Sequence, residues 1–197
     1  MSQTLRISVA DDESDMRDYF QRILPLLGHE VVSVAGTGRE LVAHCLEHRP
    51  DLAITDIKMP DMDGIDAAVQ IYERVPIPVI LVSAYHDGDL IERAEADHIL
   101  AYLVKPIKQA DLEPAISIAM RRFEQFQALR KEASDAKQAL ADRKVIERAK
   151  GVLMKRAGLD ENAAFRRMQK LASEKNKKLL DIAQILITAE EAWSSTE

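Results

Sequence analysis

The 197-residue sequence has little of several features that would define other classes of protein. It has a single cysteine, Cys45, which excludes an intramolecular disulfide and a cysteine-based zinc site. Because most neighbours of Cys45 are apolar, we expect a buried structural cysteine. No apolar run approaches the ~18 residues of a membrane span, and Asp11 and Asp12 come too early for a signal-peptide core. We therefore expect a cytosolic protein that does not enter the membrane.

Charge is distributed unevenly along the chain. Residues 1–120 hold 10 Lys or Arg against 21 Asp or Glu, whereas residues 121–197 hold 17 against 12. An acidic first part followed by a basic second part favours two domains with different roles.

The first part alternates short apolar runs with helical patterns. A short helix is expected near Leu90–Ala94, before the last of the runs. Five strands alternating with helices predict an α/β fold, in which helices cover both faces of a five-stranded parallel sheet. The strand-like runs are residues 5–9, 31–35, 52–55, 79–82 and 100–104.

After Pro106 the strand signal stops, and a long helix is predicted over Asp111–Arg156. Gly158 ends this helix, Asp160 is the expected N-cap of a second helix, and a third begins near Leu179. Apolar residues in the long helix recur at steps of three or four, which is nearly a heptad seam. The seam predicts contact with a partner helix, and the alternative is packing against its own chain. Its residues are Phe123, Phe126, Leu129, Ala133, Ala136 and Leu140.

Polar residues gather at the carboxyl ends of the predicted strands, where open parallel sheets bind ligands. Three carboxylates close together repel one another and need a cation, and oxygen ligands favour Mg²⁺. A carboxylate that attacks a phosphoryl group gives an aspartyl phosphate, whose oxygens a cation, an ammonium group and a hydroxyl can neutralise. Taken singly, the acidic pair could begin a solvated helix and the lysine could be an exposed loop residue. The set is Asp11 and Asp12 after the first strand, Asp56 after the third, Ser83 and Ala84 after the fourth, and Lys105 after the fifth.

Four stretches resemble the receiver domain of two-component response regulators: Val9–Glu13, Asp56–Gly64, Val82–Ala84 and Ala101–Pro106. The resemblance implies a flavodoxin-like receiver domain over residues 1–120, whose only catalysis is its own phosphoryl transfer. Asp56 would accept phosphate from a sensor histidine kinase. Mg²⁺ would be held by Asp11, Asp12, Asp56 and the backbone carbonyl of Lys58. Ser83 and Tyr102 would form a switch pair, with Ala84 and Lys105 beside the phosphate.

The second part is a small, basic helical module, which could bind nucleic-acid phosphates or present a solvated charged face. It resembles the ANTAR domain, an RNA-binding antiterminator module, in Ala149–Met154, Asp160–Phe165 and Leu179–Ala183. The resemblance implies an all-α, three-helix domain over residues 137–197, joined to the receiver by a helical linker at 121–136.

An ANTAR domain implies binding of paired hairpins in nascent RNA, antitermination, and an indirect action on the transcription complex. Two hairpins suit a homodimer, which we expect on phosphorylation. The alternatives are a DNA-binding regulator with a helix-turn-helix tail and a tail that docks a protein. The residues predicted to contact RNA are Arg143, Lys150, Lys155, Arg156, Arg167 and Lys170.

Overall fold

The computed structural model describes residues 4–84 and 99–194, except for the side chains of residues 193 and 194. The short helix expected near Leu90–Ala94 lies outside the described residues. The chain divides into two compact units, residues 1–127 and 128–197. Within the described ranges, none of the helices combines the length and apolar character needed to cross a bilayer.

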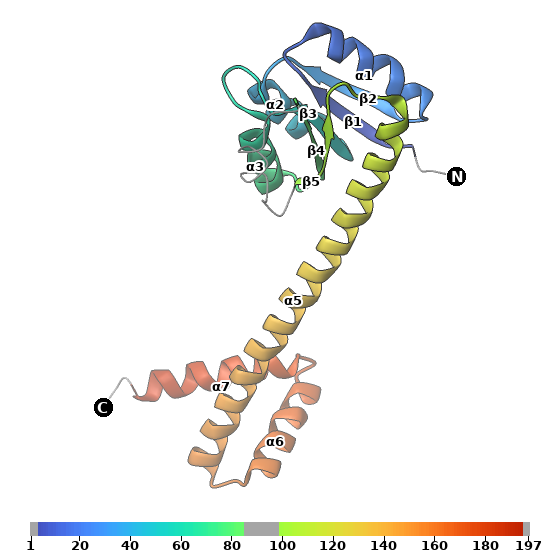
Figure 1. The fold of residues 1–197 in the computed structure, drawn as a ribbon. Coiled ribbons are helices and arrows are strands. Elements are labelled where there is room, and N and C mark those ends of the chain that lie inside the picture. Colours follow the sequence, from blue (N-terminus) through green and yellow to red (C-terminus); the bar gives the residue numbers. More distant parts are fainter. Residues whose placement is uncertain (1–3, 85–98, 195–197) are drawn as a thin grey trace. The chain divides into compact units, whose positions relative to one another are not determined.

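The first unit is built on a five-stranded parallel sheet with the strand order β2-β1-β3-β4-β5 (Figure 1). The predicted α/β fold and its five strands are confirmed. The strands are β1 (Arg6–Ala10), β2 (Glu30–Ala35), β3 (Leu52–Asp56), β4 (Val79–Ser83) and β5 (Ile99–Val104), and the helices between them are α1 (Ser14–Leu26), α2 (Gly38–His48) and α3 (Gly64–Arg74).

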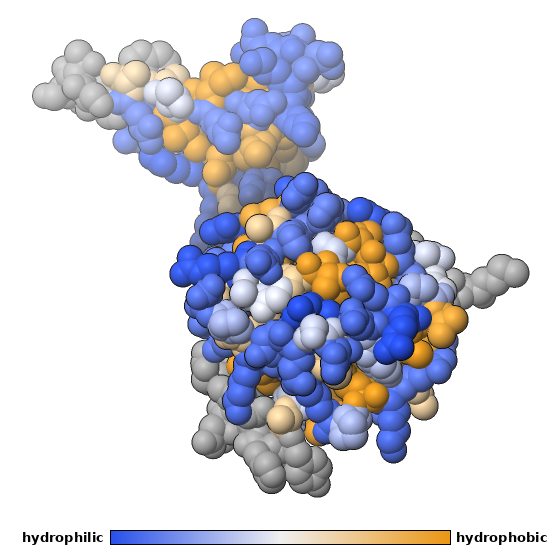
Figure 2. Space-filling model, turned by 90° about the horizontal axis from the view of Figure 1, so that it is seen from above, coloured by the Kyte–Doolittle hydropathy of each residue, from blue (hydrophilic) through white to orange (hydrophobic). Residues whose placement is uncertain are grey.

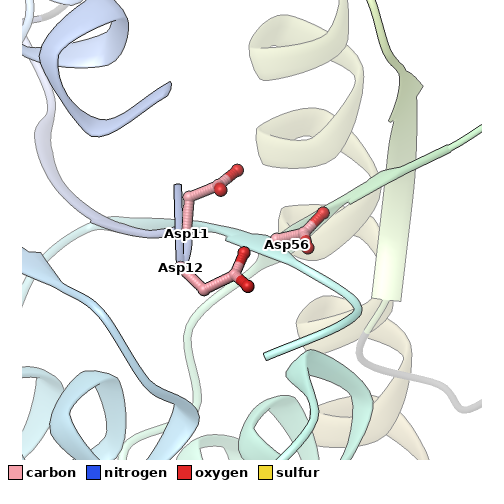
Figure 3. Close-up of side chains that lie close together, drawn as sticks. All are labelled: Asp11, Asp12 and Asp56. Carbon is pink, nitrogen blue, oxygen red and sulfur yellow. The ribbon is translucent and has the colours of Figure 1, made fainter. Parts of the chain in front are cut away.

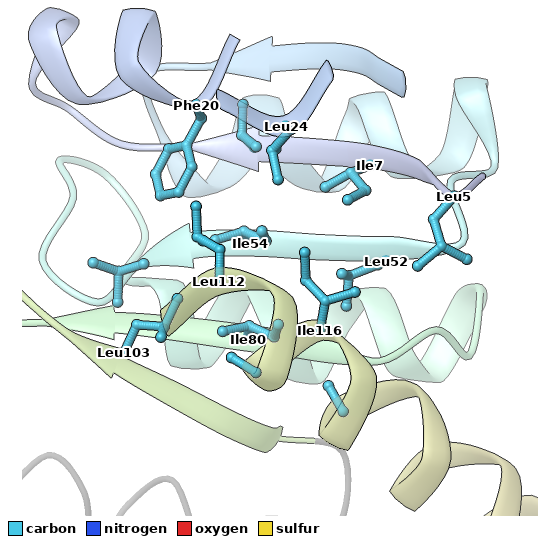
Figure 4. Packing of buried hydrophobic residues seen from close by; sticks show 14 of the residues in the cluster. Leu5, Ile7, Phe20, Leu24, Leu52, Ile54, Ile80, Leu103, Leu112 and Ile116 are labelled. Atoms are coloured by element: carbon cyan, nitrogen blue, oxygen red, sulfur yellow. The ribbon is translucent and has the colours of Figure 1, made fainter. Parts of the chain in front are cut away.

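Alternation along the strands produces a separate apolar layer on each face of the sheet. One layer joins alternate residues of β1, β3 and β4 to α1 and the start of α5 (Gln109–Ala157), with Phe20, Leu24 and Leu112 fully buried (Figure 4). The other layer joins the remaining strand residues to α2 and α3, and includes Cys45. Burial raises the pKa of the Cys45 thiol to about 12, so Cys45 is a structural residue, as expected.

Strand register determines which residues meet at the carboxyl edge of the sheet. Ala10 of β1 pairs with Thr55 of β3, so the next residues, Asp11 and Asp56, emerge side by side. Ser83 of β4 pairs with Val104 of β5, which brings Lys105 to the same edge.

The second unit contains the end of α5, together with α6 (Glu161–Glu174) and α7 (Leu179–Ser194). Gly158 has a positive φ of 63° just after α5, and the Asp160 side chain accepts a hydrogen bond from the Ala163 N–H at 2.7 Å. The predicted helix stop and N-cap are therefore confirmed. The core of this unit is small: Ala149 of α5, Met168 of α6, and Ala183 and Ile187 of α7 are buried together.

The face shown in Figure 2 is mainly hydrophilic, with hydrophobic residues exposed in patches between polar ones. Exposed large apolar side chains occur in both units, among them Tyr102 and Leu129.

Candidate functional site

Three carboxylates meet at the carboxyl edge of the sheet. Asp11, Asp12 and Asp56 each offer an oxygen within 4.8 Å of the others (Figure 3). Asp11 and Asp12 follow β1, and Asp56 is the last residue of β3. Asp11 and Asp56 are buried, whereas Asp12 is exposed. The site is therefore open to solvent on the Asp12 side and closed beneath by the sheet.

The Asp11 side chain is held in one orientation. Its Oδ1 accepts a hydrogen bond from the Glu13 backbone N–H at 3.0 Å. Its Oδ2 is fully buried and lies 3.0 Å from the Lys105 ammonium group, although no hydrogen bond of good geometry reaches this oxygen within residues 4–84 and 99–194. Burial raises the pKa of Asp11, although the Glu13 N–H and Lys105 oppose the increase. A buried, anionic oxygen needs a positively charged neighbour, so Asp11 Oδ2 is suited to contact with a cation.

Lys105 supplies the positive charge of the site. Its Nζ lies 3.0 Å from Asp11 Oδ2, 3.1 Å from Glu13 Oε1 and 3.3 Å from Asp56 Oδ1. Burial by itself lowers the pKa of Lys105, but the ion pair with Asp11 and the other carboxylates around it raise the pKa well above its usual range. The ammonium group therefore stays protonated and bridges β1 and β3.

Asp56 is the most perturbed carboxyl group of the site. Burial raises its pKa to about 6, with further increases from the charges of Asp11 and Asp12 and a decrease from Lys105. Desolvation and like charge thus outweigh the single ammonium group. A second cation would restore the balance at this edge.

The donor set fits Mg²⁺. All candidate ligand atoms are carboxylate oxygens, and this ion prefers a few carboxylates while retaining several waters. The buried Asp11 Oδ2 has the Lys105 ammonium group 3.0 Å away, so this oxygen lies in surroundings that accommodate positive charge. Lys58, whose carbonyl was a predicted ligand, is exposed just after Ile57, and the role of its carbonyl stays a prediction.

The remaining predicted receiver residues do not all lie in the site. Ser83 is buried, and its hydroxyl donates to the Ala84 carbonyl at 3.0 Å. Tyr102 lies on β5 with 54% of its surface exposed. The structure brings Asp11, Asp12, Asp56 and Lys105 together. The side chain of Tyr102, in contrast, is exposed to solvent.

Two contacts around the site have no simple signal in the sequence. Glu13 joins the Lys105 ion pairs, and only the fold brings these two residues together across 92 positions. Gly64 begins α3 so close to β3 that a Cβ atom there would overlap the carbonyl oxygen of Asp56. The Gly64 N–H also donates to the Ile57 carbonyl at 2.8 Å, which closes the loop after Asp56.

Basic residues of the second unit fall into two groups. Lys150 is buried and lies 2.8 Å from Glu147 and 2.7 Å from Glu161, which connects α5 to the start of α6. Arg156 forms an ion pair with Glu190 of α7 at 2.7 Å. The predicted RNA contacts Lys150 and Arg156 thus already have carboxylate partners within the unit.

The other predicted RNA contacts are exposed: Arg143 and Lys155 on α5, and Arg167 and Lys170 on α6. Arg167 and Lys170 line a shallow hollow of about 550 Å³ on α6, together with Asn162 and Arg166. Lys170 also lies 3.8 Å from Glu174. This face carries most of the exposed positive charge of α6.

Comparisons with known proteins agree with both parts of the chain. Residues 7–117 match the family described as response regulator receiver domain, and residues 134–187 match the ANTAR domain. A transcriptional regulatory protein, PdtaR of Mycobacterium tuberculosis, is 38% identical over 92% of this chain and 89% of its own length. A receiver domain protein from Clostridium thermocellum is 32% identical, with a TM-score of 0.56 over 61% of this chain and 97% of that protein's chain. The receiver domain of NarL from Mycobacterium tuberculosis is 26% identical, with a TM-score of 0.57 over 61% and 98% of the two chains.

The fold and the acidic site define a receiver domain. Receiver domains follow the general rule that open parallel sheets bind ligands at the carboxyl ends of their strands. The chain belongs to the response regulators in which a receiver domain is followed by an ANTAR domain. Its output part is that of a regulator rather than of an enzyme. The predicted family and the predicted domain order are confirmed.

Proposed function

We propose that this protein is a phosphorylation-controlled antiterminator, in which phosphate uptake at Asp56 regulates RNA binding by the ANTAR domain. The cluster of Asp11, Asp12, Asp56 and Lys105 is the observation that carries the first half. The match of residues 134–187 to the ANTAR domain supports the second half. A sensor histidine kinase is the proposed phosphate donor.

The site offers the groups that this phosphoryl transfer needs. A bond forms between an Asp56 carboxylate oxygen and phosphorus while the bond from phosphorus to the donor atom breaks, and its electron pair leaves with the donor. Asp11, Asp12 and Asp56, with the Lys58 carbonyl, would hold Mg²⁺, which supplies positive charge to the phosphoryl oxygens. Lys105 Nζ, 3.3 Å from Asp56 Oδ1, is placed to neutralise another of these oxygens.

Ser83 and Tyr102 are the proposed switch pair. Ser83 is adjacent to the site in the sheet, since the Lys105 N–H donates to its carbonyl at 2.9 Å. Its hydroxyl now bonds the Ala84 carbonyl and would turn to a phosphoryl oxygen on Asp56. Tyr102, now exposed, would turn inward into the space that the hydroxyl leaves.

A second copy of this chain is the proposed partner of the long helix. Residues 128–141 of α5 are exposed throughout, and an isolated helical stretch is only marginally stable in water. The spacing from Phe126 through Leu129 and Ala133 to Ala136 and Leu140 is a strict heptad repeat, and Leu129 is 64% exposed. Pairing two such helices would cover this seam and place two ANTAR domains on paired RNA hairpins.

The proposed RNA contacts are the exposed cations Arg143, Lys155, Arg167 and Lys170, with Lys150 and Arg156 acting only where their carboxylate partners release them. Arg167 and Lys170 are best placed, because they line one hollow. RNA loops offer unstacked bases as well as phosphates, so a hollow flanked by cations suits them.

Labelling with acetyl phosphate and Mg²⁺ tests the first half: the wild type should take up phosphate and Asp56→Asn should not. Persistent labelling of the variant would contradict the assignment of Asp56. Binding of a paired-hairpin RNA, with and without phosphorylation and against duplex DNA at one salt concentration, tests the second half. Stronger binding of the duplex would indicate a DNA-binding regulator instead.

Replacing both Arg167 and Lys170 with Gln should weaken RNA binding by about tenfold and reduce its salt dependence, because two phosphate contacts are lost. The matched control is Lys131→Gln, since Lys131 is an exposed cation on the linker part of α5. An equal loss of binding free energy for each removed charge, in the control and in the double variant, would show that only net charge matters.

A further inference from the structure

Arg17 on α1 reaches back to the acidic pair that precedes its helix. A single nitrogen, Nη1, donates to the backbone carbonyl of Asp11 at 2.7 Å and to that of Asp12 at 2.8 Å. Both distances are at the short end for N–H···O hydrogen bonds, as expected for a charged donor. Arg17 is half-buried, so solvent only partly competes for these bonds.

These two bonds determine how the acidic pair is presented. The carbonyls of Asp11 and Asp12 belong to the peptide units that follow each residue, so holding both carbonyls fixes the backbone between Asp11 and Glu13. The Asp11 Oδ1 is held at the same time by the Glu13 N–H at 3.0 Å. With backbone and Oδ1 both held, the buried Oδ2 is directed toward Lys105, in the space that Asp11 shares with Asp12 and Asp56.

The loop needs such a restraint, because its carboxylates repel Asp56 and one another. The raised pKa values of Asp11 and Asp56 record that burial and like charge remain only partly compensated by Lys105. Lys105 binds the carboxylates directly and occupies the space between them. Arg17 instead donates to the backbone carbonyls of the same loop, so these two hydrogen bonds do not occupy the carboxylate oxygens that an ion would use.

We propose that Arg17 is a positioning residue of the cation site: it holds the Asp11–Asp12 backbone so that both carboxylates face Asp56 before an ion arrives. This inference rests on the Mg²⁺ site of the proposed function. Groups that orient the ligands of a metal contribute to affinity through preorganisation, and their loss commonly weakens metal binding by about 10- to 100-fold.

The test compares the full-length wild type with Arg17→Gln and Arg17→Lys. The Mg²⁺ dissociation constant is measured by isothermal titration calorimetry. Phosphate uptake from acetyl phosphate is measured over a range of Mg²⁺ concentrations. We expect Arg17→Gln to weaken Mg²⁺ binding by about tenfold, while the rate at saturating Mg²⁺ stays within about twofold of the wild type. Arg17→Lys keeps a charged donor and should lose only about threefold, the equivalent of one weakened hydrogen bond.

Arg22→Gln is the matched control. Arg22 lies on the same helix, is exposed, and donates from Nε to a backbone carbonyl at 3.2 Å, but that carbonyl belongs to Asp18 within α1. This variant should bind Mg²⁺ as the wild type does. Thermal unfolding in EDTA is recorded for all variants, since a merely structural role would lower the unfolding temperature and leave the dissociation constant unchanged.

An unchanged Mg²⁺ dissociation constant in Arg17→Gln overturns the proposal. If Arg17→Gln does not fold, Arg17→Lys serves as the test. A wild-type Mg²⁺ dissociation constant in Arg17→Lys would then also overturn the proposal. A wild type that neither binds Mg²⁺ nor takes up phosphate would instead overturn the proposed function, so the two failures are distinguishable.

Discussion

Replacing Asp56 with Asn should make the metal-free protein more stable at neutral pH. Asp56 is only 7% exposed, and burial raises its pKa from 3.8 to about 6. An acid whose pKa is higher in the folded state binds its proton more tightly there. The charged form therefore opposes folding, and stability falls as the pH rises from about 4 to about 6. Asn keeps the shape of the side chain and removes the charge.

The size of the effect follows from the pKa difference. The change from 3.8 to about 6 corresponds to about 3 kcal/mol at pH 7, at about 1.4 kcal/mol for each pKa unit. At about pH 4.5 most of the Asp56 carboxyl is already protonated in the folded state, and the advantage of Asn should shrink to about 1 kcal/mol. The loss of the ion pair between Lys105 and Asp56 is included in this difference, because Lys105 lowers the same pKa.

Urea unfolding in EDTA at the two pH values measures the effect. All four tyrosines precede residue 128 in the sequence, so near-ultraviolet circular dichroism of tyrosine reports on the receiver unit. Asp18→Asn, a change at an exposed aspartate on α1, is the control and should alter stability by less than about 0.5 kcal/mol. The reasoning is refuted if Asp56→Asn is no more stable than the wild type at pH 7, or if its advantage does not diminish in acid.

Three further changes have defined outcomes. Mg²⁺ at about ten times its dissociation constant should stabilise the wild type by about 1.4 kcal/mol, and Asp11→Asn should abolish this gain in the same urea assay. Gly64→Ala should destabilise the receiver by about 1–3 kcal/mol, because its Cβ would overlap the Asp56 carbonyl oxygen; an unchanged urea midpoint would contradict that close approach. Leu129→Asp should keep the phosphorylated protein monomeric in analytical ultracentrifugation, because it places a charge in the proposed helix seam; a dimer of wild-type affinity would exclude the seam.

Much of the fold could be predicted because strands buried on both faces are continuous apolar runs. All five runs became strands, with ends within one or two residues of those expected. The long helix begins at Gln109 and ends at Ala157, close to the predicted bounds, because a single internal glycine, Gly151, and the Gly158 that follows the helix are local signals. The contact of Asp11 with Asp56 could likewise be predicted, since carboxyl ends of neighbouring parallel strands share an edge.

Contacts made by long side chains could not be predicted in the same way. Arg17 lies at an ordinary position of an amphipathic helix, and nothing local indicates that it turns back to two carbonyls. Lys150 shares one face of the long helix with Arg143 in the ANTAR-like stretch, which predicts an RNA contact, and lysine is usually exposed. Its i−3 partner, Glu147, can be read from the sequence, but Glu161 meets it only after α6 folds back onto α5.

The electrostatics of the site give a physical reason why Asp56, the proposed phosphate acceptor, would also act as a switch. Without a metal ion, the three carboxylates share one ammonium group, that of Lys105. The raised pKa of Asp56 indicates that this ammonium group only partly offsets burial and the repulsion between the carboxylates. A cation or a phosphoryl group at Asp56 would change the balance of charge at this edge of the sheet. It would also change how Lys105 divides its contacts among Asp11, Glu13 and the new group. Lys105 is only four residues before the start of α5, whose first turn is held by the Lys108 N–H bonded to the Asp111 carboxylate. A signal that repositions Lys105 would therefore need to pass through only residues 105–109 to reach the start of α5. The same helix continues into the ANTAR domain.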